Sequence, residues 1–334
     1  MVAGTSIRTR QTNRWAKQIV VSILARPSDS RGAAEARNQT AVAVSTRNWV
    51  FLGDSLTEGV GAKRVSHVTE LVKQLRTSGC AAARDANVHE FRLRHMDTFT
   101  RGVEFNVAGL LNRDLPRRAS DVWLWNLACE GQTIETDFDW LPLIAALRPE
   151  VVVIFRGSLE SIIRPAMLLD GDWPWWVPHS WRGYAAMDPR CYFSTTWWRR
   201  AKQVTVDSLK QKVRLKLLRQ RAGSPLMDLD RLAVFQADLI RSLRAIGTRV
   251  VVLGLLPVDH TCFPGSAEYF ETVNARLLEI ATAEGAEFFD WASSLAARGK
   301  HEDLFYRDGF HPNEAGTVAL AEILRERFCA ERSL

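Results

Sequence analysis

Short apolar runs begin near residue 48 and recur along the rest of the chain. They are rich in β-branched and aromatic residues, and the run 151–155 is apolar at every position, as expected for a strand covered on both faces. The runs predicted as strands are 49–52, 121–128, 151–155, 249–256 and 287–289.

Amphipathic stretches lie between these runs. In the first of them, Val68, Leu71, Val72 and Leu75 recur at helical spacing. The predicted helices are 67–77, 138–147, 230–246, 267–284 and 313–328. Strands that alternate with helices favour a parallel α/β sheet with right-handed crossovers.

Ligands of parallel α/β sheets bind beyond the carboxyl ends of the strands. This rule directs attention to the loops that follow the predicted strands. These loops are 53–62, 129–136, 156–165, 256–266 and 303–312.

Two stretches, 78–120 and 164–229, do not fit the strand–helix alternation. The second is too long for a plain connection and too aromatic for a linker. We interpret 164–229 as an insertion that serves as a lid or as a platform for substrate or membrane. Residues 1–45 are predicted to form a basic, disordered N-terminal arm, and residues 46–330 a single domain.

Composition is that of a globular protein: 46% of the 334 residues are hydrophobic and 25% are charged. The formal charge of +6 would suggest nucleic acid or an anionic membrane as partner. However, the basic surplus is concentrated in residues 1–28 and 199–221, and the remainder is net acidic. No nucleic-acid motif is found, and no nucleic-acid partner is expected.

The five cysteines are scattered and show no metal-binding spacing, which favours reduced thiols in a cytoplasmic protein. Residues 1–28 match a secretory signal only marginally. An organellar leader is an alternative to the favoured disordered arm. No run of about 18 apolar residues is present to span a bilayer. No metal or organic cofactor is implied.

Ser55 follows a predicted buried strand directly and precedes a helix, within Gly53-Asp54-Ser55. A nucleophile benefits from this position, because the strand fixes it and the following backbone N–H groups can face a developing negative charge. An ordinary strand-to-helix turn rich in Gly, Asp and Ser is the structural alternative.

Asp308 and His311 lie three residues apart near the other end of the chain, just before the last predicted helix. One loop turn at this spacing would let the carboxylate orient the imidazole. Together with Ser55, these residues would fill the three roles of a catalytic triad.

These motifs resemble those of the SGNH hydrolases, also called GDSL esterases and lipases. The first block is matched by residues 51–59 and the last, Asp-x-x-His, by residues 308–311. The resemblance covers roughly 48–160 and 230–328. It implies a flavodoxin-like three-layer α/β/α sandwich with five parallel strands. It also implies that Ser55 is the nucleophile, His311 the general base and acid, and Asp308 the orienting carboxylate.

The second family block is a strand followed by a loop glycine, which Gly131 matches. By resemblance, the backbone N–H groups of Ser55 and Gly131 form the oxyanion hole. The third block, Gly-x-Asn-Asp, departs from the family pattern, because Leu159 stands where the Asn donor is expected. Either Ser158 or Arg156 supplies the missing donor, or hydrolysis is slow or lost.

Six of the twelve tryptophans fall between residues 173 and 198. Tryptophan faces stack on sugars and pack on acyl chains, so Trp173, Trp175, Trp176 and Trp181 are candidate substrate-binding residues. The alternative is that they form the small core of the insertion. Residues 199–221 combine basic positions with a rough apolar stripe, which is typical of a membrane-surface helix or of a solvated one.

The sequence therefore predicts a serine esterase or deacylase that hydrolyses an O-acyl ester, on a carbohydrate or glycolipid, through an acyl-enzyme on Ser55. Transfer of the acyl group to a sugar is a close variant. A non-catalytic module that binds glycan or membrane is the alternative from a different class.

Overall fold

The computed structural model describes residues 47–58, 64–65, 88–89, 106–114, 122–128, 131–183 and 185–330. Three sequence predictions fall outside these residues. They are the N-terminal arm 1–45 with its possible leader, the loop 59–62 and the helix 67–77.

Five parallel strands form the central sheet in the order β4-β1-β5-β8-β9. Taken in chain order, these strands have the spatial order 2-1-3-4-5 of a flavodoxin-like fold. The predicted fold class is thus confirmed. The strands are β1 (Arg47–Gly53), β4 (Val122–Asn126), β5 (Val151–Phe155), β8 (Arg249–Leu253) and β9 (Glu287–Phe289).

The three inner strands are buried on both faces. All five residues of β5, and all but the first of β1 and of β8, are buried. Trp49 of β1 packs on Phe328 with ring centroids 4.9 Å apart, and Phe155 of β5 packs on Trp291 at 4.8 Å. The apolar runs of the sequence thus lie in the centre of the core, where they fix the carboxyl ends of the strands.

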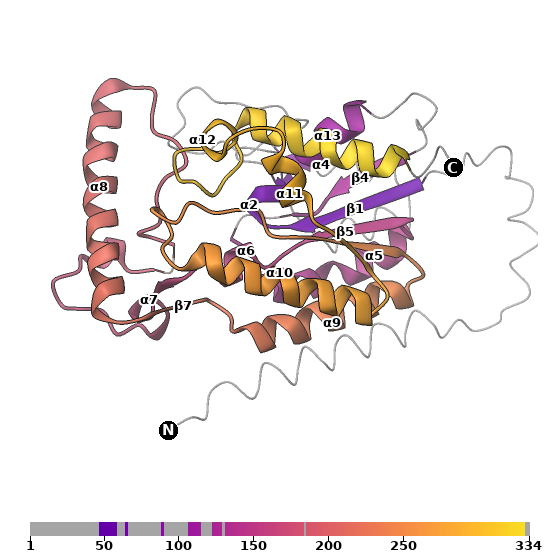
Figure 1. The fold of residues 1–334 in the computed structure, drawn as a ribbon, viewed down its shortest axis with the longest axis horizontal. Helices are drawn as coiled ribbons and strands as arrows, with labels where there is room; N and C mark the ends of the chain where they lie inside the picture. Colours follow the sequence, from indigo (N-terminus) through magenta and orange to yellow (C-terminus); the bar gives the residue numbers. More distant parts are fainter. Residues whose placement is uncertain are drawn as a thin grey trace, which may run out of the picture.

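Helices cover both faces of the sheet (Figure 1). On one face α4 (Val107–Asp114), α11 (Trp291–Ala296) and α13 (Glu314–Ala330) pack together. On the other lie the 3-10 helix η3 and helices α5, α9 and α10. Their bounds are η3 (Ile134–Trp140), α5 (Leu141–Leu147), α9 (Leu229–Ala245) and α10 (Ser266–Ala283).

Capping side chains fix the starts of several of these helices. Asp228 accepts the Arg231 N–H at the start of α9, at 2.8 Å. Asn313 accepts the Gly316 N–H at 3.0 Å ahead of α13. Each cap satisfies a backbone donor that lacks an intrahelical partner. The predicted helix 138–147 is in fact the end of η3 followed by α5.

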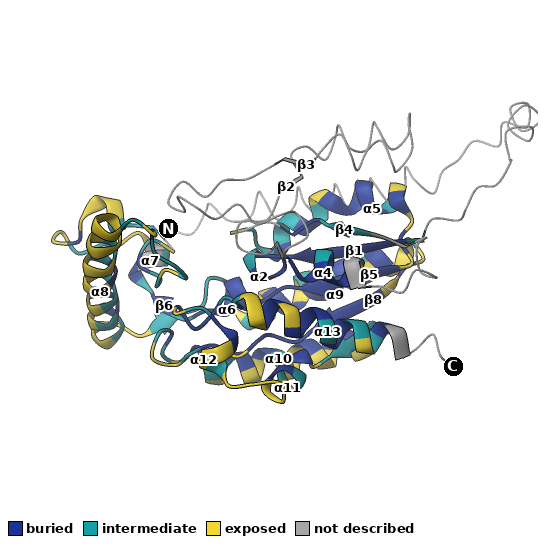
Figure 2. Cartoon of the chain, turned by 90° about the horizontal axis from the view of Figure 1, so that it is seen from above, coloured by how far each residue is buried: buried dark blue, intermediate teal, exposed yellow. Residues whose placement is uncertain are grey.

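The insertion leaves and rejoins the sheet domain through a short ribbon, in which β6 (Arg164–Pro165) pairs antiparallel with β7 (Gly223–Ser224). Between them lie α7 (Met167–Asp170), the 3-10 helix η4 (His179–Trp181) and the long helix α8 (Trp197–Gln220). Helix α8 stands beyond the carboxyl ends of the strands, and much of its surface is exposed (Figures 1 and 2).

A second antiparallel pair, separate from the central sheet, is formed by β2 (Arg64–Val65) and β3 (Val88–His89). Among the helices of the described ranges, none combines the length and the apolar content needed to cross a membrane.

Candidate active site

Ser55 lies at the point where β1 ends and the short helix α2 (Ser55–Glu58) begins. The preceding Asp54 is fully buried and accepts the Leu56 N–H at 2.9 Å, and its carbonyl accepts the Thr57 N–H at 3.2 Å. These bonds hold a tight strand-to-helix turn. Ser55 itself stays partly exposed, as a nucleophile must be.

His311 and Asp308 lie on the loop between α12 (His301–Leu304) and α13. Asp308 is buried, and its Oδ1 accepts the backbone N–H groups of Phe310 and His311, each at 3.1 Å. Gly309 has a φ of +64°, and a Cβ there would lie 2.2 Å from Asp259 Cβ. Only glycine fits this left-handed and crowded position, so Gly309 shapes the turn that brings Asp308 back to His311.

The side chains of Ser55, His311 and Asp308 form a continuous hydrogen-bonded relay. Ser55 Oγ lies 2.8 Å from His311 Nε2, and His311 Nδ1 lies 2.6 Å from Asp308 Oδ2. With the Nδ1 proton donated to Asp308, Nε2 is the acceptor for the Ser55 hydroxyl. This arrangement activates a serine for attack on an acyl carbon.

Gly131, the predicted second oxyanion donor, is exposed and has a φ of +73°. It lies on the loop that follows β4, at the same edge of the sheet as Ser55. No atom of the described residues lies within 4 Å of the position that a Cβ would take, so the space on that side is open. Its left-handed backbone is one that glycine adopts without strain.

Neither predicted substitute for the missing Asn donor presents an accessible side chain. Ser158 is buried, and its Oγ has no hydrogen-bond partner among the described residues. Arg156 is fully buried, and all three of its side-chain nitrogens donate to other protein groups. Leu159, at the Asn position itself, is buried on α6 (Ser158–Ser161).

Arg156 instead forms a buried ion pair with Asp137 of η3. Its Nε and Nη2 lie 2.7 and 2.5 Å from the two carboxylate oxygens, and its Nη1 donates to the Gln132 carbonyl at 2.7 Å. A bidentate pair of this kind fixes both partners in geometry as well as charge. Arg156 therefore links β5 to the loop that carries Gly131.

Glu160 is a second buried link between the segment that follows β5 and the loop that carries Gly131. Its Oε1 accepts the Ile134 N–H at 2.7 Å and its Oε2 accepts the Gly157 N–H at 3.2 Å. Burial raises the pKa of Glu160 to about 7, against the opposing charge of Arg156. Burial also raises the pKa values of Asp54 and Asp137.

Sequence reasoning missed this buried cluster of Asp54, Asp137, Arg156 and Glu160. The available signal was weak: each of Asp54, Arg156 and Glu160 lies at or near the end of an apolar strand, where a charge needs a partner. Nothing in the pattern indicates that Asp137, on a different element, is the partner of Arg156.

The insertion touches the catalytic loop next to the triad. Arg307 donates to the Arg190 carbonyl at 3.0 Å and to Asp207 of α8 at 2.8 Å. Its guanidinium also lies over the Phe193 ring, 4.1 Å from the centroid. The segment 190–193 therefore forms a wall beside Asp308 and His311.

Two buried arginines hold the segment just before this wall, through contacts with Asp188. Arg164 donates from Nη2 and Nε to Asp188 Oδ2, at 2.7 and 3.0 Å, and Arg214 of α8 lies near the same carboxylate. Arg214 also donates to the Cys262 carbonyl. These contacts seat the insertion on the sheet domain and hold segment 190–193 in place.

The four tryptophans predicted to bind substrate fall into two groups. Trp173 and Trp181 are partly buried and pack against the small core of the insertion. Trp175 is 90% exposed and Trp176 is 38% exposed. Trp173 and Trp181 thus belong to the core of the insertion, and Trp175 and Trp176 remain candidate substrate-binding residues.

Residues 199–220 of the predicted amphipathic segment 199–221 lie in helix α8. The residues it buries are Asp207, Arg214 and Leu217. Val204 and Leu209, which belong to the predicted stripe, are exposed. Charged anchors to Arg307 and Asp188 set the orientation of the helix, and hydrophobic spacing could not reveal them.

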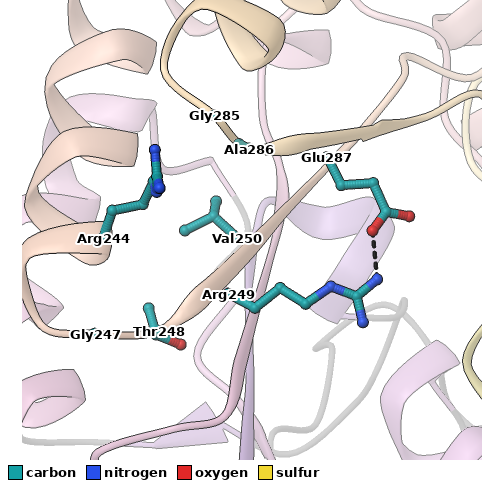
Figure 3. Close-up of a pocket in the computed structure, with 8 residues that line it drawn as sticks. All are labelled: Arg244, Gly247, Thr248, Arg249, Val250, Gly285, Ala286 and Glu287. Atoms are coloured by element: carbon teal, nitrogen blue, oxygen red, sulfur yellow. Dashed lines mark hydrogen bonds and ion pairs between the residues drawn. The ribbon is translucent and has the colours of Figure 1, made fainter.

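A surface cavity of about 590 Å³ lies at the opposite edge of the sheet (Figure 3). Arg249 and Glu287, which begin β8 and β9, form an ion pair at its wall. Arg244 and Val250 also line it, and no triad residue does. Because ligands of such sheets bind at the carboxyl ends of the strands, this cavity is separate from the candidate site.

Comparison with known proteins gives one family match. Residues 222–319 match the profile of the GDSL-like Lipase/Acylhydrolase family. This segment contains Asp308 and His311 but not Ser55, which the fold brings to them. No curated protein matches the chain.

Several solved structures match the chain at low sequence identity. TesA matches with 16% identity and a TM-score of 0.44, over 86% of this chain and 100% of its own. LAE5, an alpha/beta hydrolase from the metagenome of Lake Arreo, Spain, matches with 13% identity and a TM-score of 0.47, over 86% and 94%. A variant of Axe2, an acetyl xylan esterase from Geobacillus stearothermophilus, matches with 12% identity and a TM-score of 0.48, over 86% and 94%.

Proposed function

We propose, from the premise that this chain is a carboxylic ester hydrolase of the SGNH (GDSL) type, that it removes O-acyl groups from a carbohydrate or glycolipid. The premise rests on the family match over residues 222–319 and on the sheet topology. The observation that carries the proposal is the relay from Ser55 through His311 to Asp308.

In this proposal, Ser55 Oγ attacks the acyl carbonyl carbon as its proton passes to His311 Nε2. Asp308 stabilises the resulting imidazolium through Nδ1. The backbone N–H groups of Ser55 and Gly131 receive the oxyanion. When the intermediate collapses, the alcohol leaves with the proton from Nε2, and an acyl-enzyme remains. His311 Nε2 then takes a proton from water as the water oxygen bonds to the acyl carbon. When this second intermediate collapses, the bond from the acyl carbon to Ser55 Oγ breaks, Oγ receives the proton from Nε2, and the acid is released.

A sugar acceptor is supported by the side chains that the insertion exposes. Trp175 and Trp176 offer aromatic faces on the part of the chain that stands beyond the carboxyl ends of the strands. Sugar rings stack on such faces, and their hydroxyls can bond to a neighbouring polar group such as Lys216, whose ammonium lies 5.5 Å from the centroid of the Trp176 ring. The exposed tryptophans therefore favour a substrate larger than a simple ester.

The test is a panel of esters assayed with purified enzyme. Its members are a partly O-acetylated oligosaccharide, 4-nitrophenyl acetate and a long-chain 4-nitrophenyl ester. We expect Trp175→Ala to raise KM for the acetylated oligosaccharide roughly 2- to 10-fold, equivalent to one aromatic contact of about 0.5–1.5 kcal/mol. Its kcat/KM for 4-nitrophenyl acetate should not change.

Trp197→Ala is the matched control, because Trp197 is also highly exposed but lies at the start of α8. Equal effects of both substitutions on the oligosaccharide ester would count against a sugar site at Trp175. Adding a free sugar and analysing the products by mass spectrometry separates hydrolysis from acyl transfer, because only transfer yields a newly acylated sugar.

A non-catalytic glycan-binding module is the second candidate, and the third block favours it. Leu159 offers no side-chain donor, and Ser158 and Arg156 are both buried. Loss of one oxyanion donor lowers turnover by about 10²–10³ in other enzymes. Oligosaccharide binding without turnover of any ester would support this candidate.

A further inference from the structure

A third chemical group lies against the two triad residues of the catalytic loop. The ligand atoms of Cys191, Asp308 and His311 all lie within 4.8 Å of one another. Cys191 belongs to the insertion, some 120 residues before Asp308 in the chain, and neither the relay nor the proposed hydrolysis uses its thiol. We propose that these three side chains form a Zn²⁺ site through which the ion reversibly inhibits the enzyme.

The two segments that carry these ligands, one in the insertion and one in the catalytic loop, are both held in place. The neighbours of Cys191 are fixed through Arg307, which bonds to the Arg190 carbonyl and packs on Phe193. Asp308 is held by the backbone N–H groups of its own loop. The segment that carries Cys191 is therefore held beside the triad by specific contacts. Little movement of this segment or of the catalytic loop is needed to bind an ion.

The donor set fits zinc. Thiolate, imidazole and carboxylate are its usual protein ligands, at about 2.0–2.3 Å from the ion. Ligand atoms around a tetrahedral ion at these lengths lie about 3.3–3.8 Å apart. The observed spacing of up to 4.8 Å therefore requires the ligand atoms to move together by at most about 1.5 Å. Three protein ligands leave one position for water, and the thiolate disfavours Mg²⁺ and Ca²⁺.

Zinc at this site must interrupt the relay. Nε2 of His311 is bonded to Ser55 and Nδ1 to Asp308, so an ion on either nitrogen displaces one of the two bonds. An ion on Asp308 also competes for the carboxylate that orients the imidazole. Metal binding by these residues is independent of the proposed function, whereas the inhibition rests on it.

Binding is tested with Co²⁺, which reports a thiolate ligand through a charge-transfer absorption band. The protein is freed of metal with a chelator and titrated with Co²⁺ as wild type, Cys191→Ser and Cys262→Ser. Cys262 is the matched control, since it is a partly buried free thiol outside the group of three. We expect the band in wild type and Cys262→Ser and its loss in Cys191→Ser.

Inhibition is tested with Zn²⁺ in the ester assay, each variant being compared with its own metal-free rate. We expect EDTA to reverse the inhibition. We expect Cys191→Ser to raise the half-inhibitory Zn²⁺ concentration at least about tenfold, because removing even a group that only hydrogen-bonds to a metal ligand lowers metal affinity by about 10- to 100-fold. A band that persists in Cys191→Ser, or equal inhibition of all three proteins, would overturn the proposal.

The two readouts separate this proposal from the proposed function. A Cys191-dependent cobalt band in a protein that hydrolyses no ester would support the metal site and refute the esterase. An active enzyme without such a band would refute the metal site alone.

Discussion

Ser55 Oγ and His311 Nε2 lie 2.8 Å apart although 256 residues separate them in the chain. Two loops at the carboxyl edge of one sheet create this contact, one after β1 and the other before α13. Neither loop could form the relay alone. The contact is therefore a product of the fold and places the chemistry where parallel sheets bind their ligands.

The first prediction concerns the carboxylate of the relay. Asp308→Asn should lower kcat by about 10³–10⁴, because an amide beside Nδ1 favours the wrong imidazole tautomer. The measurement is steady-state hydrolysis of 4-nitrophenyl acetate together with a thermal unfolding curve. Asp303→Asn, an exposed acid near the same loop, is the control and should leave kcat unchanged. Similar loss in both variants would contradict an orienting role for Asp308.

The second prediction concerns the missing oxyanion donor. Leu159→Asn should raise kcat at least about tenfold, since one donor is worth about 10²–10³ in other enzymes. It should also cost about 1–3 kcal/mol of unfolding free energy, because a polar group replaces a buried apolar one. Leu159→Ala is the control that opens the same space without adding a donor. If Asn and Ala behaved alike, position 159 would not face the oxyanion.

The third prediction concerns Glu160 and the pH dependence of stability. Its pKa of about 7 in the folded protein lies above the ordinary value of 4.5. Between these values the folded state binds more protons than the unfolded state, so the free energy of unfolding falls as pH rises through this window. One such group contributes a slope of up to about 1.4 kcal/mol per pH unit.

Glu160→Gln should remove this part of the slope, because the amide stays neutral at every pH. The measurement is urea unfolding of both proteins at several pH values between 4.5 and 8. Glu302→Gln, an exposed acid on α12, serves as control and should keep the wild-type slope. An unchanged slope in Glu160→Gln would show that Glu160 ionises normally.

The fourth prediction concerns the start of α8, which we propose as a peripheral membrane contact. Trp197 is 80% exposed and Trp198 is 52% exposed, and the basic residues Arg199, Arg200 and Lys202 follow them. Aromatic and basic side chains together bind the interface of anionic bilayers, and salt weakens the attraction. The protein should float with anionic vesicles and not with neutral ones.

The double substitution Trp197→Ala/Trp198→Ala should abolish flotation. Leu278→Ala, an exposed apolar residue on α10, is the control and should not. Equal recovery with neutral vesicles, or flotation that survives the double substitution, would contradict a membrane role for this end of α8.

Much of the sheet could be predicted from the sequence, because its inner strands are buried on both faces and form continuous apolar runs. Ser55 could be placed at a strand-end loop for the same reason, whereas the predicted strand-end loop of Asp308 and His311 is in fact the connection between α12 and α13. The buried pair of Arg156 and Asp137 could not, since such pairs follow from three-dimensional proximity and leave no periodic trace.

The way the insertion packs on the sheet domain could not be predicted from the sequence either. Hydrophobic spacing indicated only a rough apolar stripe along α8, whereas the helix is held on the sheet domain through Asp207 and Arg214. Their partners Arg307 and Asp188 lie on other elements, so the spacing along α8 carries no information about them. The position of Cys191 beside the triad depends on the same contacts.

The central claim, that Ser55 is an activated nucleophile, is tested most directly by labelling with a fluorophosphonate and measuring the mass of the intact protein. The account predicts one adduct per chain, mapped to Ser55. The adduct should be absent in Ser55→Ala and retained in Ser158→Ala, whose hydroxyl is buried. A folded wild-type protein that takes no label, or a label that persists in Ser55→Ala, would contradict the account.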